Sequence, residues 1–294
     1  MLSSLKRRIQ VSCVTIIALA MILTTAVSYF TVESHYEKAI EKNLNAVADG
    51  NASAIEEWIA SRTSMIEAAR APVAGGDPVT ALIQLAESGG FLSAYLGKPD
   101  GSLMSSDGWV PPADYDPRKR GWYRDALDRD ETIVSMPYVD ANSGEIVVSF
   151  ATPVERSGKL VGVIGSDVVI DTVVADIKAI QPTPSSFAFL SMGGETLIAH
   201  PNTDLTLKPL SRLNEKLTPS TIAAIGNSSD WQNVVIDGRS KRLAIAPIPG
   251  SEWELGVALD EQEATAGLQA IIKSSLITML VVLIVAATLL GLWL

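Results

Sequence analysis

Two long apolar segments, one near each end of the chain, constrain its fold more than any other feature. Val11 to Phe30 contains no charged residue, and neither does Ser274 to Leu294. Each segment is about 20 residues long, which is the length of helix that spans the roughly 30 Å hydrocarbon core of a bilayer. The sequence therefore predicts two transmembrane helices, with the residues between them on one side of the membrane.

A basic cluster sets the predicted orientation. Lys6, Arg7 and Arg8 precede the first apolar segment, and positive charges stay on the cytoplasmic side of a membrane. Residues 32–273 should then lie outside the cytoplasm. A cleavable signal peptide is the alternative for the first segment, although its apolar run exceeds the roughly 7–15 residues usual for such peptides.

The pattern between the two apolar segments changes from helical to mixed. Apolar residues recur at spacings of three and four from about Val32 to Arg70, which predicts a long stalk helix. Two similar sets of strand-like segments follow, and Gln181-Pro182-Thr183-Pro184 separates them as a linker. The strand-like segments are Phe91 to Leu96, Leu103 to Ser105, Ile146 to Val154 and Leu160 to Val169 in the first set, and Phe187 to Ser191, Thr196 to Ala199, Lys241 to Pro247 and Trp253 to Leu259 in the second.

This repetition predicts an α+β fold with two related modules in tandem, each built on an antiparallel sheet. The predicted organisation is a cytoplasmic stub (1–10), a transmembrane helix (11–31), a stalk helix (32–72), a membrane-distal module (73–181), a membrane-proximal module (182–262), and a connecting helix with the second transmembrane helix (263–294).

The composition argues against several classes of function. The formal net charge is −10, which makes nucleic acid an improbable partner. The single cysteine, Cys13, lies in the first apolar segment, so the exported part has no disulfide. With only His35 and His200 as histidines, no metal cluster is predicted. No nucleophile motif, phosphate loop or acid–base pair is recognisable, so we predict no enzyme activity and no cofactor.

The stretch from Tyr115 to Asp167 combines charges of both signs with polar aromatic residues. Arg120 offers a planar fork of donors that suits a carboxylate. Asp140 and Asp167 can accept hydrogen bonds from an ammonium group, and Asp167 ends an apolar strand where a carboxylate requires partners. Because each charge of a zwitterion needs its own partner once desolvated, the set suits an α-amino acid.

Each of these residues also has a structural interpretation. Arg118-Lys119-Arg120 could form a solvated basic face, and Trp122 and Tyr123 could be core residues of a short amphipathic helix. Asp140 could cap the turn that runs to Gly144.

Taken together, the set resembles the amino-acid-binding motif of the double-Cache sensor domains of bacterial methyl-accepting chemotaxis proteins. The residues that carry the resemblance are Tyr115, Arg120, Trp122, Tyr123, Tyr138, Asp140 and Asp167. The order of span, long helix, two modules and span is also similar. The chain departs from the family in having Gly121 where many relatives have proline, and in ending at Leu294, before the expected cytoplasmic signalling part.

The resemblance implies a role for each residue. Tyr115, Arg120 and Trp122 would hold the ligand carboxylate, and Tyr123, Asp140 and Asp167 would hold its amine. Tyr138 and Tyr95 would line the pocket. It also implies two tandem PAS-like (Cache) modules, of which the membrane-distal one binds the ligand.

The function implied is that of a transmembrane chemoreceptor sensor region in the cytoplasmic (inner) membrane. Residues 32–273 would lie in the periplasm, bind an L-amino acid, and transmit binding to the second transmembrane helix. The expected partners are that small-molecule ligand, the lipid bilayer and a second copy in a homodimer. Two alternatives remain. The same sensor could serve a histidine kinase or a cyclic-dinucleotide enzyme, or the chain could be an anchored periplasmic interaction protein without a ligand.

Overall fold

The computed structural model describes residues 2–228 and 231–293, so Met1 and Leu294, at the ends of the predicted stub and second span, lie outside it. The chain divides into two compact units. One comprises the two chain ends, up to Leu44 and from Asp260, and the other comprises residues 45–259.

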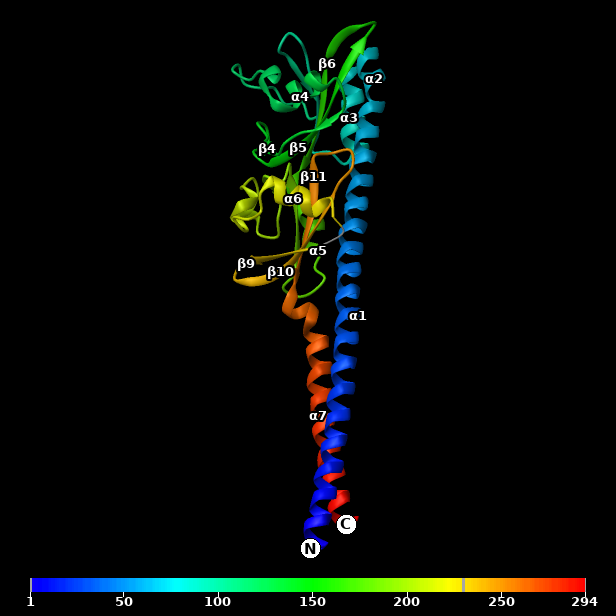
Figure 1. The fold of residues 1–294 in the computed structure, drawn as a ribbon. Coiled ribbons are helices and arrows are strands. Elements are labelled where there is room, and N and C mark those ends of the chain that lie inside the picture. Colours follow the sequence, from blue (N-terminus) through cyan, green and yellow to red (C-terminus); the bar gives the residue numbers. More distant parts are fainter. Residues whose placement is uncertain (1, 229–230, 294) are drawn as a thin grey trace. The chain divides into compact units, whose positions relative to one another are not determined.

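The terminal unit consists of helices that match the two predicted spans. Helix α1 (Leu2–Ala68) is continuous through the first apolar segment and the stalk, and α7 (Glu261–Trp293) contains the second. Both contain windows apolar enough to cross a membrane, with mean hydropathies of 2.2 and 2.4, and 0% of either window is buried inside the protein. The two chain ends lie at the same end of this unit, so α7 runs antiparallel to the start of α1 (Figure 1).

A six-stranded antiparallel sheet forms the first module of the central unit. Its order is β2-β1-β6-β5-β3, with β4 also paired to β5. The strands are β1 (Ser93–Gly97), β2 (Leu103–Ser105), β3 (Ile133–Val134), β4 (Tyr138–Val139), β5 (Ile146–Arg156) and β6 (Lys159–Val169). Figure 1 shows α4 (Gly121–Arg129) on one side of this sheet, and α2 (Arg70–Gly75), α3 (Pro78–Gly89) and part of α1 on the other.

The alternation of side chains along β5 explains how this sheet packs against helices on both of its faces. Successive strand residues point to opposite faces. Phe150 contacts Trp58 of α1 with ring centroids 5.7 Å apart, whereas Ala151 belongs to a cluster with Trp122 of α4. The two faces therefore have separate cores, and α4 covers only one of them.

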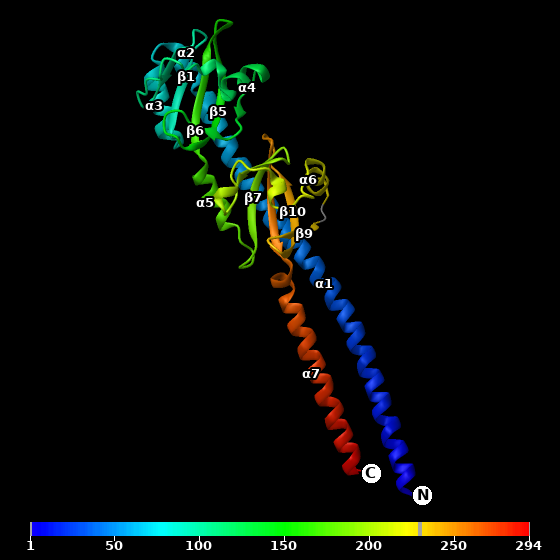
Figure 2. The same ribbon diagram turned by 90° about the vertical axis from the view of Figure 1, so that its left-hand side faces the viewer.

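A five-stranded antiparallel sheet forms the second module, in the order β8-β7-β11-β10-β9. The strands are β7 (Phe187–Met192), β8 (Thr196–Ala199), β9 (Gln232–Ile236), β10 (Arg239–Pro247) and β11 (Trp253–Asp260). Helix α5 (Ile170–Ala179) connects the two sheets, and α6 (Pro219–Gly226) contributes Ile222 and Ile225 to the second core (Figure 2). Short 3-10 turns lie at Pro117–Lys119, Thr203–Leu205 and Leu210–Arg212.

The two sheets repeat one plan, which confirms the predicted α+β fold with two antiparallel modules. Hairpin β1–β2 corresponds to β7–β8, and the central strand β6 corresponds to β11. The correspondence extends to residues, because Tyr95 lies opposite Gly165 in the first sheet as Phe189 lies opposite Gly256 in the second. The eight strands predicted from the sequence are present, whereas β3, β4, β9 and α6 were not predicted.

Candidate functional site

The candidate site is built around Asp167, on the central strand of the first sheet. Its neighbours across the ladder are Ser93 on β1 and Ser149 on β5. Its side chain is completely buried, with 0% exposure. Its Oδ1 atom accepts hydrogen bonds from Ser149 Oγ at 2.6 Å, Tyr95 Oη at 2.8 Å and Tyr138 Oη at 3.4 Å. Its Oδ2 atom has no hydrogen-bond partner among the described residues.

This environment controls the ionisation of Asp167. Burial raises the pKa of Asp167 to about 7, and the nearby Asp140 carboxylate also raises it, against the hydrogen bonds from Ser149, Tyr95 and Tyr138. Burial, followed by the charge of Asp167, raises the pKa of Tyr95 and of Tyr138, so both phenols stay protonated and donate. The result is a carboxylate with one saturated oxygen and one oxygen open to a donor.

Glycine residues make room for the aromatic rings above the sheet. A Cβ atom at Gly165 would lie 2.3 Å from Cε2 of Tyr95, so only glycine lets that ring cross β6 towards Asp167. A Cβ atom at Gly97 would lie 2.9 Å from Trp122 and 3.0 Å from Tyr123. Gly165 therefore makes room for the Tyr95 ring, and Gly97 allows α4 to pack directly on β1.

Arg120 provides a positive charge beside this cluster. It follows the 3-10 turn Pro117–Lys119 and caps the start of α4 in an extended conformation. Its guanidinium carbon lies 4.9 Å from the Tyr138 ring centroid and 5.9 Å from that of Tyr115, and Nη2 donates to the Val139 carbonyl at 3.2 Å. It forms no ion pair with any carboxylate in the described part of the chain, whereas Arg118 pairs with Asp116 at 2.9 Å. The structural interpretation thus suits Arg118 but not Arg120.

Tyr115 and Trp122 lie on the same side of the site as Arg120. Trp122 is a fully buried residue of α4, and its indole lies near the Tyr115 hydroxyl. Burial raises the pKa of Tyr115, Arg120 lowers it, and Asp167 and Asp140 raise it. The Tyr115 hydroxyl is thus within the electrostatic reach of both charged ends of the site.

Asp140 caps the turn, as its structural interpretation predicted. Its Oδ2 atom accepts from Ser143 N at 2.7 Å, Ser143 Oγ at 2.8 Å and Asn142 N at 3.2 Å, so it caps the turn. Its charge also acts on Asp167 and Tyr115. None of the three hydrogen bonds uses Oδ1, which leaves one oxygen of Asp140 outside the cap.

The structure does not bring Tyr123 to this cluster. Its ring packs against Gly97, and the charges that act on its hydroxyl are those of Arg118, Asp116 and Asp100. Tyr95 and Tyr138, expected only to line a pocket, instead hydrogen-bond to Asp167. Sequence reasoning missed Ser149, which is one of two hydroxyl residues, with Thr152, in the otherwise apolar run from Ile146 to Val154.

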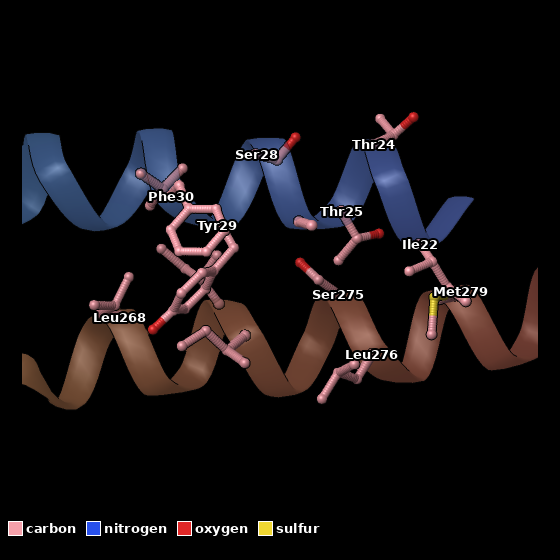
Figure 3. A pocket seen from close by; sticks show the side chains of 14 residues that line it. Ile22, Thr24, Thr25, Ser28, Tyr29, Phe30, Leu268, Ser275, Leu276 and Met279 are labelled. Carbon is pink, nitrogen blue, oxygen red and sulfur yellow. The ribbon is translucent and has the colours of Figure 1, made fainter. Parts of the chain in front are cut away.

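One pocket lies beside Arg120, and another lies between the two predicted membrane spans. One of about 340 Å³ is lined by Arg120, Trp122, Ser135, Met136 and Tyr138 among others, and Asp167 is not part of its lining. Another, of about 520 Å³, lies in the terminal unit between α1 and α7, where Thr25 and Ser275 point towards one another (Figure 3). The second pocket is mostly apolar and belongs to the predicted spans, far along the sequence from the charged cluster.

Comparison with known proteins identifies the family of the chain. Residues 32–268 match the family model described as "Cache domain". The chain is 30% identical over 296 residues to the methyl-accepting chemotaxis protein McpA of Pseudomonas putida, covering 98% of this chain and 45% of that protein. It is 28% identical to the methyl-accepting chemotaxis protein PctB of Pseudomonas aeruginosa, covering 94% of this chain and 45% of PctB. The chain therefore spans about half the length of these relatives.

Solved structures are similar over the central part of the chain. The ligand-binding domain of the Pseudomonas fluorescens chemoreceptor CtaA, in complex with L-isoleucine, has a TM-score of 0.70 and 27% identity, covering 81% of this chain and 99% of that one. The ligand-binding domain of Pseudomonas aeruginosa PctB, in complex with L-Arg, has a TM-score of 0.69 and 30% identity, covering 78% and 98%. Both names describe the ligand-binding domain of a chemoreceptor in complex with an amino acid, and neither name describes an enzyme.

Proposed function

Because the chain belongs to the Cache domain family, we propose that it is the sensor region of a transmembrane chemoreceptor that binds an L-α-amino acid. The observation that carries this proposal is the charge arrangement of the site. Asp167 presents one buried carboxylate oxygen without a partner, and Arg120 beside it has no carboxylate partner among the described residues. A zwitterion supplies the missing partner to each, which offsets the cost of burying both charges.

The proposed ligand pose follows from this arrangement. The ammonium group donates to Oδ2 of Asp167 and to the oxygen of Asp140 that the turn does not use. The carboxylate accepts from the guanidinium of Arg120, with the Trp122 indole and the Tyr115 hydroxyl on the same side. Tyr95 and Tyr138 hold the Asp167 carboxylate in place. An amine contact from Tyr123, which the family motif implies, requires its hydroxyl to leave the neighbourhood of Arg118.

The proposed location is the cytoplasmic (inner) membrane, with residues 32–273 in the periplasm. We also propose the domain limits expected from the sequence, with ligand binding in residues 73–181. Support comes from the apolar windows of α1 and α7 and from β11, which ends at Asp260 where α7 begins at Glu261. Ligand-dependent movement of the second module would thus act directly on α7.

The proposed assembly is a homodimer formed along α1. Between residues 46 and 64, the exposed face of this helix carries mostly small side chains, which let two helices approach closely. These exposed small residues are Ala46, Gly50, Ser53, Ala54, Ala60, Ser61 and Ser64. A chemotaxis output is favoured over a kinase or cyclic-dinucleotide enzyme because the relatives named above are methyl-accepting chemotaxis proteins.

A binding screen tests the proposed function. The full chain in lipid nanodiscs is titrated calorimetrically with the common L-amino acids, and the best binder is compared with its N-acetyl and amide derivatives. We expect at least one amino acid to bind, and both derivatives to bind more weakly because each lacks one charge. The absence of binding by every amino acid, or equal binding of the derivatives, contradicts the proposal.

A further inference from the structure

Arg62, on the inner face of α1, carries a charge that the protein does not neutralise. Its Nε atom is buried and has no hydrogen-bond partner within the described residues. Its guanidinium carbon lies 4.1 Å from the Trp58 ring centroid, and Nη1 donates a long hydrogen bond, 3.5 Å, to the Trp58 carbonyl. A guanidinium keeps its charge in proteins, so this edge of Arg62 is an unused pair of donors.

A pocket of about 210 Å³ lies next to this guanidinium. Its walls come from α1, the segment between α3 and β1, the end of β6 and α5, all within the central unit. Trp58, Phe91, Leu92 and Val168 give it an apolar lining. The lining hydroxyl of Thr172 already donates to the Val169 carbonyl at 2.7 Å. Arg62 therefore lines the pocket with a hydrogen-bond donor, Nε, that has no partner among the described residues.

Asp176 on α5 lines the same pocket but does not neutralise Arg62. No ion pair joins the two side chains in the part of the chain that the structure describes. Both charges therefore face the pocket from separate walls. A second negative charge on a ligand would be repelled by Asp176, which favours a ligand with a single carboxylate.

This pocket is separate from the amino-acid site. Val168 and Asp167 are neighbours along β6, so their side chains point to opposite faces of the sheet. The backbone N–H of Leu92 donates to the carbonyl of Asp167 at 2.8 Å, which ties the rim of the pocket to the same strand position. Occupation of one site can then affect the other through β6.

We propose that this pocket is a second ligand site, which binds a small monocarboxylate with a short apolar tail. The carboxylate accepts two parallel hydrogen bonds from Nε and a terminal nitrogen of Arg62, the side-on pairing that a guanidinium offers. The tail lies on Trp58, Phe91 and Leu92. The site does not depend on the proposed amino-acid function, because it uses none of the same side chains.

Propionate is the probe for the test. Saturation-transfer NMR and the thermal unfolding midpoint are measured on the full chain in nanodiscs. We expect propionate to bind at millimolar concentration or below, and Arg62→Gln to weaken that binding by roughly 10-fold or more. Lys178→Gln, which removes a positive charge from the exposed side of α5, is the matched control and should bind as the wild type does. Arg120→Ala should also bind propionate normally.

Two results overturn the proposal. One is the absence of propionate binding to the wild type, and the other is binding that Arg120→Ala abolishes and Arg62→Gln retains, which assigns the anion to the amino-acid site. If Arg62→Gln does not fold, Leu92→Trp fills the pocket without removing a charge and should block propionate equally. If β-alanine binds more tightly than propionate and Asp176→Asn removes this difference, Asp176 is a partner for an ammonium group on the ligand.

Discussion

At the scale of single residues, we expect Asp167 to make amino-acid binding depend on pH. Its pKa in the folded protein is about 7, against an ordinary value of 3.8, chiefly because of burial. The ammonium of an amino acid requires the ionised carboxylate. We expect the dissociation constant to rise as the pH falls below 7, by about tenfold for each pH unit. Titrations between pH 5 and pH 8 with the wild type and Asp167→Asn test this, since the variant should lose the dependence.

The same group has the opposite effect on the stability of the unliganded protein. A raised pKa means that the folded state holds the proton at pH values where the unfolded state has lost it. The contribution of Asp167 is therefore fully present below pH 3.8 and is lost as the pH rises through about 7. Unfolding of wild type and Asp167→Asn, compared across this range without ligand, should show their difference changing in that direction; a constant difference contradicts it.

Tyr95 and Tyr123, whose rings both contact Trp122, should differ in how much their hydroxyl groups contribute to ligand binding. Tyr95→Phe removes a donor that lies 2.8 Å from Asp167, so we expect roughly tenfold weaker amino-acid binding. Tyr123→Phe removes a hydroxyl that lies towards Arg118, so we expect affinity within about twofold of the wild type. Calorimetry with both variants decides the matter. A large loss in Tyr123→Phe would mean that this hydroxyl reaches the ligand amine.

At the scale of elements, a hydrogen bond joins the loop that follows β2 to the turn between β4 and β5. Asn142 Nδ2, in the turn capped by Asp140, donates to Asp107 Oδ2 at 2.8 Å. Asp107 also accepts from Trp109 N at 3.0 Å, and the Trp109 ring contacts Tyr115 with centroids 5.1 Å apart. The bond thus connects the amine side of the site to the carboxylate side.

Loss of this connection should act on ligand release. We expect Asn142→Ala to increase the dissociation rate several-fold and to leave the association rate nearly unchanged. Stopped-flow measurement of tryptophan fluorescence separates the two rates. Ser102→Ala, which removes a similar local bond at the Asp100 turn, is the control and should change neither rate. An effect confined to the association rate would contradict the role given to this bond.

The elements differ in how far the sequence predicts them. Long strands such as β5 and β6 are mostly apolar, and the cap by Asp77 at the start of α3 follows from residue type. β9 was missed because only two of its five residues are buried, so its apolar pattern is weak. Ser149 was missed because its role depends on the register that places it opposite Asp167. The direction of the Tyr123 hydroxyl depends on how α4 sits on Gly97, which local sequence does not specify.

At the scale of the whole molecule, comparison of the two repeated sheets supports the proposed ligand site in the first module. Tyr95 and Gly165 correspond to Phe189 and Gly256, and two residues further along the central strands Asp167 corresponds to Ala258. Phe189 and Ala258 both belong to the apolar core of the second module. At these two positions the second module therefore lacks the hydroxyl and the carboxylate of the first, and we expect one tightly bound amino acid per chain.

The most direct test of the central claim is a thermodynamic cycle on the Asp167–ammonium contact. The dissociation constants of the best amino acid and of the matching carboxylic acid without its amine are measured by calorimetry, for the wild type and for Asp167→Asn. The account predicts that the substitution weakens binding of the amino acid by roughly 30-fold or more. Binding of the amine-free acid should be nearly unchanged or slightly tighter. Equal losses for the two ligands would contradict the claim that Asp167 recognises the ligand amine.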